Sequence, residues 1–447
     1  MAAAISPSLL ILLGFMVFIG SLSEGSKEEV GIYEIKNGNF SVKITNYGAT
    51  VISVILPDKN GKLEDVVLGF DSVDDYKNNK AYFGAILGRV ANRIGGAKFK
   101  LNGTVYRLPA NDHGNTLHGG PSGFSYVVWK VEDYKKDHHL TLSYNSSDGE
   151  QGFPGELSVK VTYMLIGKNK LILRMKAKAV NKATPVNLAS HTYWNLGGHD
   201  SGDILSHKIQ LFGSKITPLD EQFIPTGVIE PVKGTPYDFL TARVIRSRWD
   251  ELPGGYDINY VLDSYRFTHL QKAAVIEDRK SSRKLDMWTN QPGDILSRKY
   301  RLFSSKTTPL DDQLIPTSAI EPVKGTFGFL KTRVIKSQWD ELTGGYGINY
   351  MLDSHRFRHL RKAAVVEDGK SGRKLELWTN QPGVQFYTSN MLNDTKGKGG
   401  FVYRKHAALC LETQGFPDAV NHPNFPSQIL NPEETYDHVM VYRFTAH

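Results

Sequence analysis

The sequence predicts an all-β protein built as one large antiparallel sandwich. Aromatic residues that favour strands are frequent, with 21 Tyr and 21 Phe among 447 residues. Short runs of alternating or β-branched apolar residues recur along most of the chain. Turn-forming Gly, Pro, Asn and Asp separate these runs, while helical patterns are few and short. Many short strands at regular spacing in a single domain are typical of a sandwich.

The individual elements follow from the same patterns. One short helix is predicted over Ser72–Asn78, since Ser72 can cap its start, and Asp74 and Asp75 suit the positive end of a helix dipole. Strands are predicted where alternating or branched apolar side chains persist. These segments are Ser41–Thr45, Thr50–Leu56, Leu140–Tyr144, Leu157–Leu165, Lys170–Ala179, Lys208–Leu211, Ala407–Glu412 and His438–Phe444.

The first 25 residues are set apart from this domain. An apolar run from Leu9 to Ile19 is followed by small and polar residues. The run is short for a membrane span and suits the core of a signal peptide. No Lys or Arg precedes it, so an uncleaved anchor is the alternative. We therefore expect a signal peptide over residues 1–25, a secreted domain over residues 26–447, and glycosylation at one or more of four sequons: Asn39, Asn102, Asn145 and Asn393.

Several classes of function are excluded by composition and motifs. The net charge of +8 is spread over the chain without a basic stripe, so no nucleic-acid partner is expected. The only cysteine is Cys410, which rules out an intrachain disulfide and a cluster of thiolate metal ligands. No metal-binding, dinucleotide-binding or phosphate-binding motif is present. We expect neither a metal nor a cofactor.

A segment of about 90 residues occurs twice, as residues 203–293 and 294–383. Two long, nearly identical copies indicate a tandem duplication, since a solenoid needs three or more shorter repeats. The copies differ where GGYDINY (254–260) becomes GGYGINY (344–350), so that Asp257 is replaced by Gly347. Copy two also lacks the equivalent of Asp238. We therefore expect copy one to supply the functional site.

Three arrangements of the duplicated segment are open. Either copy can complete the sandwich and expel the other. A hybrid can also form, with early strands from one copy and late strands from the other. In the hybrid, the late strand Lys374–Asn380 keeps its direct connection to Gln385.

Polar side chains cluster within otherwise apolar stretches. The clusters are GRVANRIGG (88–96), NTLHGG (115–120), NLASHTYWNLGG (187–198), GGYDINY (254–260), QPGVQFYTSN (381–390) and ALCLETQGFPDAVNHPNFP (408–426). In this order they resemble the aldose 1-epimerases (galactose mutarotases), over about Gly31 to Phe444 and interrupted only by the extra copy. LETQGFPDAVNHPNFP and SHTYWNLGG are the most specific of these motifs.

The resemblance implies a large antiparallel β-supersandwich of the galactose mutarotase type, whose cleft binds a free hexose such as glucose or galactose. It implies that Glu412 is the catalytic base and His191 the catalytic acid. It further implies that the sugar hydroxyls are held by five residues: Asn92, Arg93, His118, Asp257 and Gln385. No metal or cofactor is implied.

These residue types suit that chemistry. A carboxylate with an ordinary pKa of ~4.3 accepts a proton at neutral pH, and an imidazole with a pKa of ~6.5 can donate one. Amide, guanidinium, imidazole and carboxylate groups together match hydroxyls, which both donate and accept. Tyr193 or Trp194 could stack on a sugar face. Cys410 is expected to be a small buried residue of its strand rather than a nucleophile.

Each residue also has a structural interpretation. A glutamate at a strand end is usually solvated, a lone histidine is usually a hydrogen-bonded core residue, and the others can stabilise turns. Three alternative functions remain open: a catalytically impaired carbohydrate-binding protein of the same fold, a glycosidase that pairs Glu412 with Asp257, and a relative acting on hexose 6-phosphates. We expect a monomer, with a domain-swapped dimer as the alternative.

Overall fold

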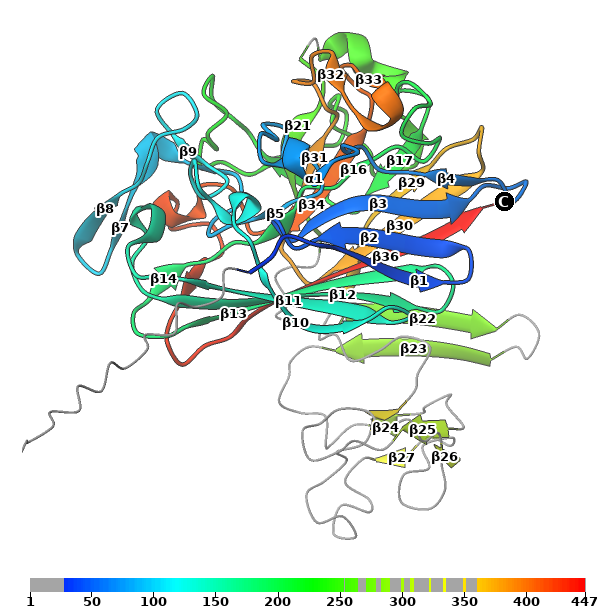
Figure 1. Cartoon of the computed structure of the whole chain (residues 1–447), viewed down its shortest axis with the longest axis horizontal. Coiled ribbons are helices and arrows are strands. Elements are labelled where there is room, and N and C mark those ends of the chain that lie inside the picture. Colours follow the sequence, from blue (N-terminus) through cyan, green and yellow to red (C-terminus); the bar gives the residue numbers. More distant parts are fainter. Residues whose placement is uncertain are drawn as a thin grey trace, which may run out of the picture.

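The computed structural model describes residues 28–252, 254–263 and 360–446, together with the backbone of short strands between residues 271 and 350 (Figure 1). The predicted signal peptide lies outside the described residues. No helix among the described residues is long and apolar enough to cross a membrane.

The largest sheet in the described part of the chain contains nine antiparallel strands. Their order in the sheet is β10 (Lys130–Lys135), β11 (His139–Ser146), β12 (Leu157–Ile166), β13 (Lys170–Ala179), β36 (Tyr436–Ala446), β30 (Arg373–Thr379), β29 (Arg361–Glu367), β17 (Lys208–Leu211) and β20 (Arg243–Val244). Burial alternates along β12, with Leu157, Val159, Val161 and Tyr163 facing the core.

Two smaller antiparallel sheets accompany the large one. A six-stranded sheet has the order β16 (Tyr193–Trp194), β34 (Leu409–Gln414), β31 (Gly383–Tyr387), β21 (Asp257–Val261), β18 (Lys215–Thr217) and β19 (Glu230–Pro231). A four-stranded sheet has the order β1 (Ile32–Asn37), β2 (Phe40–Thr45), β3 (Thr50–Pro57) and β4 (Leu63–Asp65). One continuous apolar core joins the three sheets through residues such as Val42, Leu377 and Phe386.

Short elements connect these sheets and shape one end of the molecule. The helix α1 (Val73–Tyr76) is shorter than predicted, and the Ser72 Oγ accepts a hydrogen bond from the Asp74 N–H at 3.1 Å, as its capping role requires. The short strands are β5 (Ile86–Leu87), β6 (Arg93–Ile94), β7 (Lys98–Leu101), β8 (Thr104–Arg107), β9 (Thr116–Leu117), β14 (Thr184–Pro185), β15 (Ala189–Ser190), β32 (Thr395–Lys396), β33 (Val402–Tyr403) and β35 (Ile429–Leu430).

The all-β sandwich prediction is confirmed, and each of the eight predicted strands is present. Most boundaries agree within about two residues. At the segment predicted as Ala407–Glu412, β34 starts two residues later, at Leu409, and continues to Gln414. Glu412 therefore lies inside a strand, opposite Gln385 of β31, and not at a solvated strand end.

The sandwich is a hybrid of the two copies. Its strands β17, β18, β19, β20 and β21 come from copy one, whereas β29 and β30 come from copy two. The equivalent hairpin of copy one, β22 (Gln271–Asp278) with β23 (Arg283–Thr289), pairs as a separate two-stranded sheet. It repeats the register of β29 and β30, including the irregularity between Lys272 and Ala274 that matches the one between Lys362 and Ala364.

The early strands of copy two also repeat the pairing of their counterparts. Strand β24 (Lys299–Tyr300) pairs with β27 (Arg333–Val334), and β25 (Lys306–Thr308) pairs with β26 (Glu321–Pro322) and with β28 (Asn349–Tyr350). These pairings reproduce β17 with β20, and β18 with β19 and β21. Both copies therefore encode the same local strand pairing, although only parts of each complete the sandwich.

Candidate active site

Strand β34 places the central residues of the site on one face of the six-stranded sheet. Gln385 of β31 lies opposite Glu412, and Tyr193 of β16 lies opposite Cys410. Because side chains two residues apart on a strand share a face, Cys410 and Glu412 point to the same side. The local strand pairing thus gathers four side chains that are distant in the sequence.

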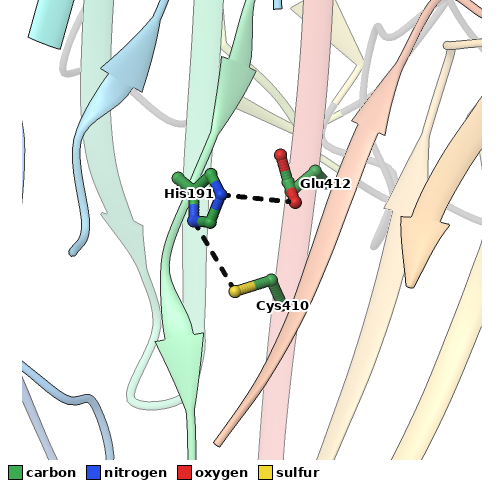
Figure 2. A group of neighbouring side chains, drawn as sticks. All are labelled: His191, Cys410 and Glu412. Atoms are coloured by element: carbon green, nitrogen blue, oxygen red, sulfur yellow. Dashed lines mark hydrogen bonds and ion pairs between the residues drawn. The ribbon is translucent and has the colours of Figure 1, made fainter. Parts of the chain in front are cut away.

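The two predicted proton-transfer residues, His191 and Glu412, lie side by side (Figure 2). The distance from His191 Nε2 to Glu412 Oε1 is 3.7 Å, and the two side chains are only 7% and 2% exposed. The other ring nitrogen, His191 Nδ1, lies 3.7 Å from Cys410 Sγ. The ring of Tyr193 stacks on that of His191, with centroids 5.1 Å apart.

Asp257 and Gln385 form the neighbouring part of the site. The Gln385 Nε2–H donates to Asp257 Oδ1 at 2.7 Å. Among the described atoms, two buried acceptors have no hydrogen-bond partner here, Gln385 Oε1 and Glu412 Oε2. Buried polar atoms are rarely left unpaired, so these two oxygens indicate a ligand that donates hydrogen bonds.

Asn92 and His118 hold each other in place on the opposite wall. Both have left-handed backbones, with φ of 62° and 52°. The Asn92 backbone N–H donates to His118 Nδ1 at 3.1 Å, and the His118 N–H donates to the Asn92 carbonyl at 3.0 Å. Since His118 Nδ1 accepts, the proton of this imidazole is on Nε2, where it is available to a ligand oxygen.

Arg93 is held by a residue that the sequence did not single out. Its Nε–H donates to Asp112 Oδ2 at 2.6 Å, and both side chains are largely buried. The guanidinium also lies 4.9 Å from the ring centroid of Phe223. Asp112 follows no recognisable motif, and only the packing of the loop after β8 brings it to Arg93.

Burial shifts the pKa values of the central pair in opposite directions. It lowers the pKa of His191 to about 4 and, with the charge of Asp257, raises the pKa of Glu412 well above its usual value. The ordinary values assumed from sequence therefore do not apply. Burial therefore disfavours the charged form of each of the two groups.

The seven predicted site residues line one cavity of about 370 Å³. This volume falls in the range of about 300–1,000 Å³ found for small-molecule sites. Of the two stacking candidates, Tyr193 lines the cavity, while Trp194 turns to the other face of β16 and packs on Tyr442 and Phe444. Aromatic side chains that the sequence did not single out also line it: Phe70, Tyr82 and Tyr387.

One group of three possible metal ligands occurs among the described residues. Two of its members, His191 and Glu412, line this cavity, and the third, Cys410, is fully buried beside His191. His191, Cys410 and Glu412 each offer a ligand atom, and these atoms lie within 4.8 Å of one another. The other polar side chains of the cavity include amides, the Asp257 carboxylate and two cations, Lys80 and Arg93. Amide, carboxylate and guanidinium groups together can pair with hydroxyls, which both donate and accept hydrogen bonds.

Comparison with known proteins gives consistent matches. The family model described as aldose 1-epimerase matches residues 31–296 and 292–443, so that each matched segment includes one of the two copies. A galactose mutarotase from Mus musculus is 34% identical over 415 residues, which cover 93% of this chain and 94% of the relative. An aldose 1-epimerase from Escherichia coli (strain K12) is 28% identical over 412 residues, covering 92% and 93%.

Solved structures show the same fold. An aldose epimerase homologue from C. elegans has a TM-score of 0.67 at 23% identity, covering 94% of this chain and 99% of its own. A galactose 1-epimerase from Lactobacillus acidophilus NCFM has a TM-score of 0.62 at 20% identity, with the same coverage.

Proposed function

The chain belongs to the aldose 1-epimerase family, and we propose that it interconverts the α and β anomers of a free hexose by proton transfer between Glu412 and His191. The resemblance inferred from the motifs is confirmed, and the protein is an isomerase of the mutarotase type. Galactose and glucose are the proposed substrates, since the relatives are named for galactose or for aldoses in general.

The proposed reaction moves one proton at each end of a short relay. The Glu412 carboxylate takes the proton of the C1 hydroxyl, the bond between C1 and the ring oxygen breaks, and the ring oxygen takes a proton from His191. The C1 carbonyl group rotates, and the ring closes on its other face by the reverse transfers. The two sugar oxygens are bonded to the same carbon, which fits two catalytic atoms separated by 3.7 Å.

The pKa shifts of Glu412 and His191 decide which of the two residues carries the proton. Burial disfavours the charged form of both groups, so it favours the neutral carboxyl and the neutral imidazole over the ion pair. Sugar hydroxyls that donate to the unpartnered Glu412 Oε2 stabilise the carboxylate. We propose that substrate binding thereby favours the reactive state, in which the proton is on His191.

The remaining site residues are proposed to bind hydroxyls. Asp257 and Gln385 accept from them, while the His118 Nε2–H and the guanidinium of Arg93 donate. The ring of Tyr193 is available for contact with an apolar sugar face. The observation that carries the proposal is the buried His191–Glu412 pair, next to acceptors without partners, inside a cavity of hexose size.

Polarimetry tests this function. Freshly dissolved α-D-galactose or α-D-glucose should approach its equilibrium rotation faster when the protein is present. Replacing Glu412 with Gln removes the base and should lower kcat by roughly 100-fold or more, with a smaller change in KM. Glu434→Gln, at an exposed position, is the matched control. A wild-type protein that binds galactose in a titration without speeding the decay would instead support the carbohydrate-binding alternative.

We also propose that the protein is secreted, glycosylated and monomeric. The Asn side chains of all four sequons are exposed, as a glycosylated side chain must be. When the chain is expressed in a secreting eukaryotic cell, the protein should be found in the culture medium and should start near residue 26. It should lose mass on treatment with a glycosidase specific for N-linked glycans. A retained, full-length chain would support the anchor, and a solution mass of two chains would support a domain-swapped dimer.

A further inference from the structure

We propose that His191, Cys410 and Glu412 form a binding site for Zn²⁺, and that the bound ion inhibits the enzyme. The three side chains lie next to one another, with His191 between Cys410 and Glu412, as Figure 2 shows. Thiolate, imidazole and carboxylate are the three ligand types that zinc takes in proteins. Three protein ligands leave a fourth position open toward the cavity, which water or a sugar hydroxyl can fill.

The distances suit a tetrahedral ion after a small adjustment. Ligand atoms around zinc lie about 3.3–3.7 Å apart when the metal–ligand bonds have their usual lengths. The distance from Cys410 Sγ to His191 Nδ1 is 3.7 Å, and that from Glu412 Oε1 to His191 Nε2 is 3.7 Å. These two contacts use different nitrogens of the ring, and one ion binds only one of them. One ligand atom of each residue lies within 4.8 Å of the others, so side-chain rotations that shorten these distances are needed for one ion to bind all three residues.

Acceptor atoms that a cation can bind lie close to the three side chains. Glu412 is 2% exposed, and its Oε2 has no partner among the described atoms, so a lone pair in the cavity is available. Asp257 adds a second carboxylate to the same cavity. The nearby guanidinium of Arg93 is already paired with Asp112 at 2.6 Å. The cavity reaches solvent, since Met391 and Asn393 at its edge are exposed.

The bound ion would act as an inhibitor and not as a cofactor. Coordination occupies the imidazole lone pair and the carboxylate oxygen that the proposed relay needs, so neither group can exchange a proton. The inhibition rests on the proposed function, whereas the binding itself does not. Cys410 would bind zinc but has no part in the proposed proton relay. Substituting Cys410 therefore tests zinc binding separately from catalysis.

Two measurements on untagged full-length protein test the site. With Co²⁺ as the probe, the wild type should show a sulfur-to-cobalt absorption band in the near ultraviolet, and neither Cys410→Ala nor Cys410→Ser should show it. In polarimetry, Zn²⁺ should inhibit the wild type reversibly, with recovery after chelation. Measured against its own rate without zinc, each variant should need roughly 10- to 100-fold more Zn²⁺ than the wild type for half inhibition.

Either of two results would overturn the site. One is a wild-type cobalt spectrum without the sulfur band. The other is equal zinc inhibition of the wild type and the Cys410 variants, which would place the inhibitory ion on other residues. If the wild type lacks mutarotase activity, the proposed function fails, yet the cobalt spectrum still decides whether the metal site exists.

Discussion

At the scale of single residues, burial controls the proton balance of the site. The Glu412–His191 pair is active while it carries one proton. Adding a second proton requires passing below the lowered His191 pKa of about 4, and removing the single proton requires passing above the raised pKa of Glu412. We expect kcat/KM to fall on both sides of this range.

Asp257 affects the pH at which kcat/KM falls on the alkaline side. Its negative charge contributes to the raised pKa of Glu412, so removing the charge lowers that pKa. In Asp257→Asn, the alkaline fall of kcat/KM should therefore move to lower pH, and KM should rise because a hydroxyl acceptor is lost. Asp250→Asn, at an exposed site, is the control. An alkaline limb that stays in place or moves to higher pH contradicts this role.

Asp112 acts through Arg93. Without the carboxylate that holds its Nε, the guanidinium loses a charge-assisted hydrogen bond of about 1.5–3 kcal/mol and its fixed orientation. Steady-state kinetics of Asp112→Asn should show KM raised by roughly tenfold with a much smaller change in kcat. Asp137→Asn, exposed on the turn after β10, should match the wild type. A loss confined to kcat would mean that Arg93 acts in the chemical step and not in binding.

At the scale of elements, particular residues explain why the sandwich takes its strands from both copies. His207, just before β17, is buried, and its Nε2 accepts from the Leu196 N–H at 3.2 Å. The equivalent position of copy two is Arg298, and an arginine cannot accept a hydrogen bond. Ile209 is fully buried, and its counterpart is the larger Tyr300. The early strands of copy one therefore fit better.

The late hairpin shows the opposite preference. Gly372, in the turn between β29 and β30, has a φ of 70°, and copy one has Ser282 at the equivalent position. A residue with a Cβ pays about 1–2 kcal/mol for that backbone conformation. Gly372→Ser should lower the free energy of unfolding by about this amount, measured in a denaturant titration.

A matched control is available in the same turn. Gly369 is exposed, has open space around its Cα and has no positive φ, and copy one has Arg279 there. Gly369→Arg should change the free energy of unfolding by less than about 0.5 kcal/mol. Equal losses in Gly369→Arg and Gly372→Ser would show that backbone strain does not distinguish the two hairpins.

At the scale of the whole molecule, the strands described between Asp263 and Leu360 pair only with one another and not with the strands of the sandwich. The contribution of copy one to the sandwich ends at Asp263, whose backbone N–H donates to the Phe212 carbonyl. The large sheet then continues with β29 of copy two, which begins at Arg361. Deleting residues 264–353 joins Asp263 to Ser354 and restores a single copy. Closing the shorter loop costs about 2 kcal/mol less entropy.

The deletion variant should be soluble, at least as stable to heat as the full chain, and as active within about twofold. Thermal unfolding and polarimetry on the two proteins, side by side, measure this. An insoluble or inactive deletion variant would show that the sandwich depends on residues between 264 and 353.

The sequence predicted the strands because each strand pattern is local, and its motifs marked seven residues that line one cavity in the structure. It did not predict the pKa values of Glu412 and His191, since these depend on burial by strands far apart in the chain. Asp112 was missed because no motif marks it. The choice between Tyr193 and Trp194 required knowing which face of β16 borders the cavity. The hybrid was one of three open arrangements, since the copies differ in only a few decisive side chains.

The most direct test of the shared proton relay is exchange NMR on an equilibrated hexose, which follows the anomeric protons of both forms. The wild type should give exchange cross-peaks between the α and β signals. Glu412→Gln and His191→Asn should each abolish them, and the double variant should be no worse than either, because the two groups act as one unit. Persistent exchange in either single variant would contradict the relay.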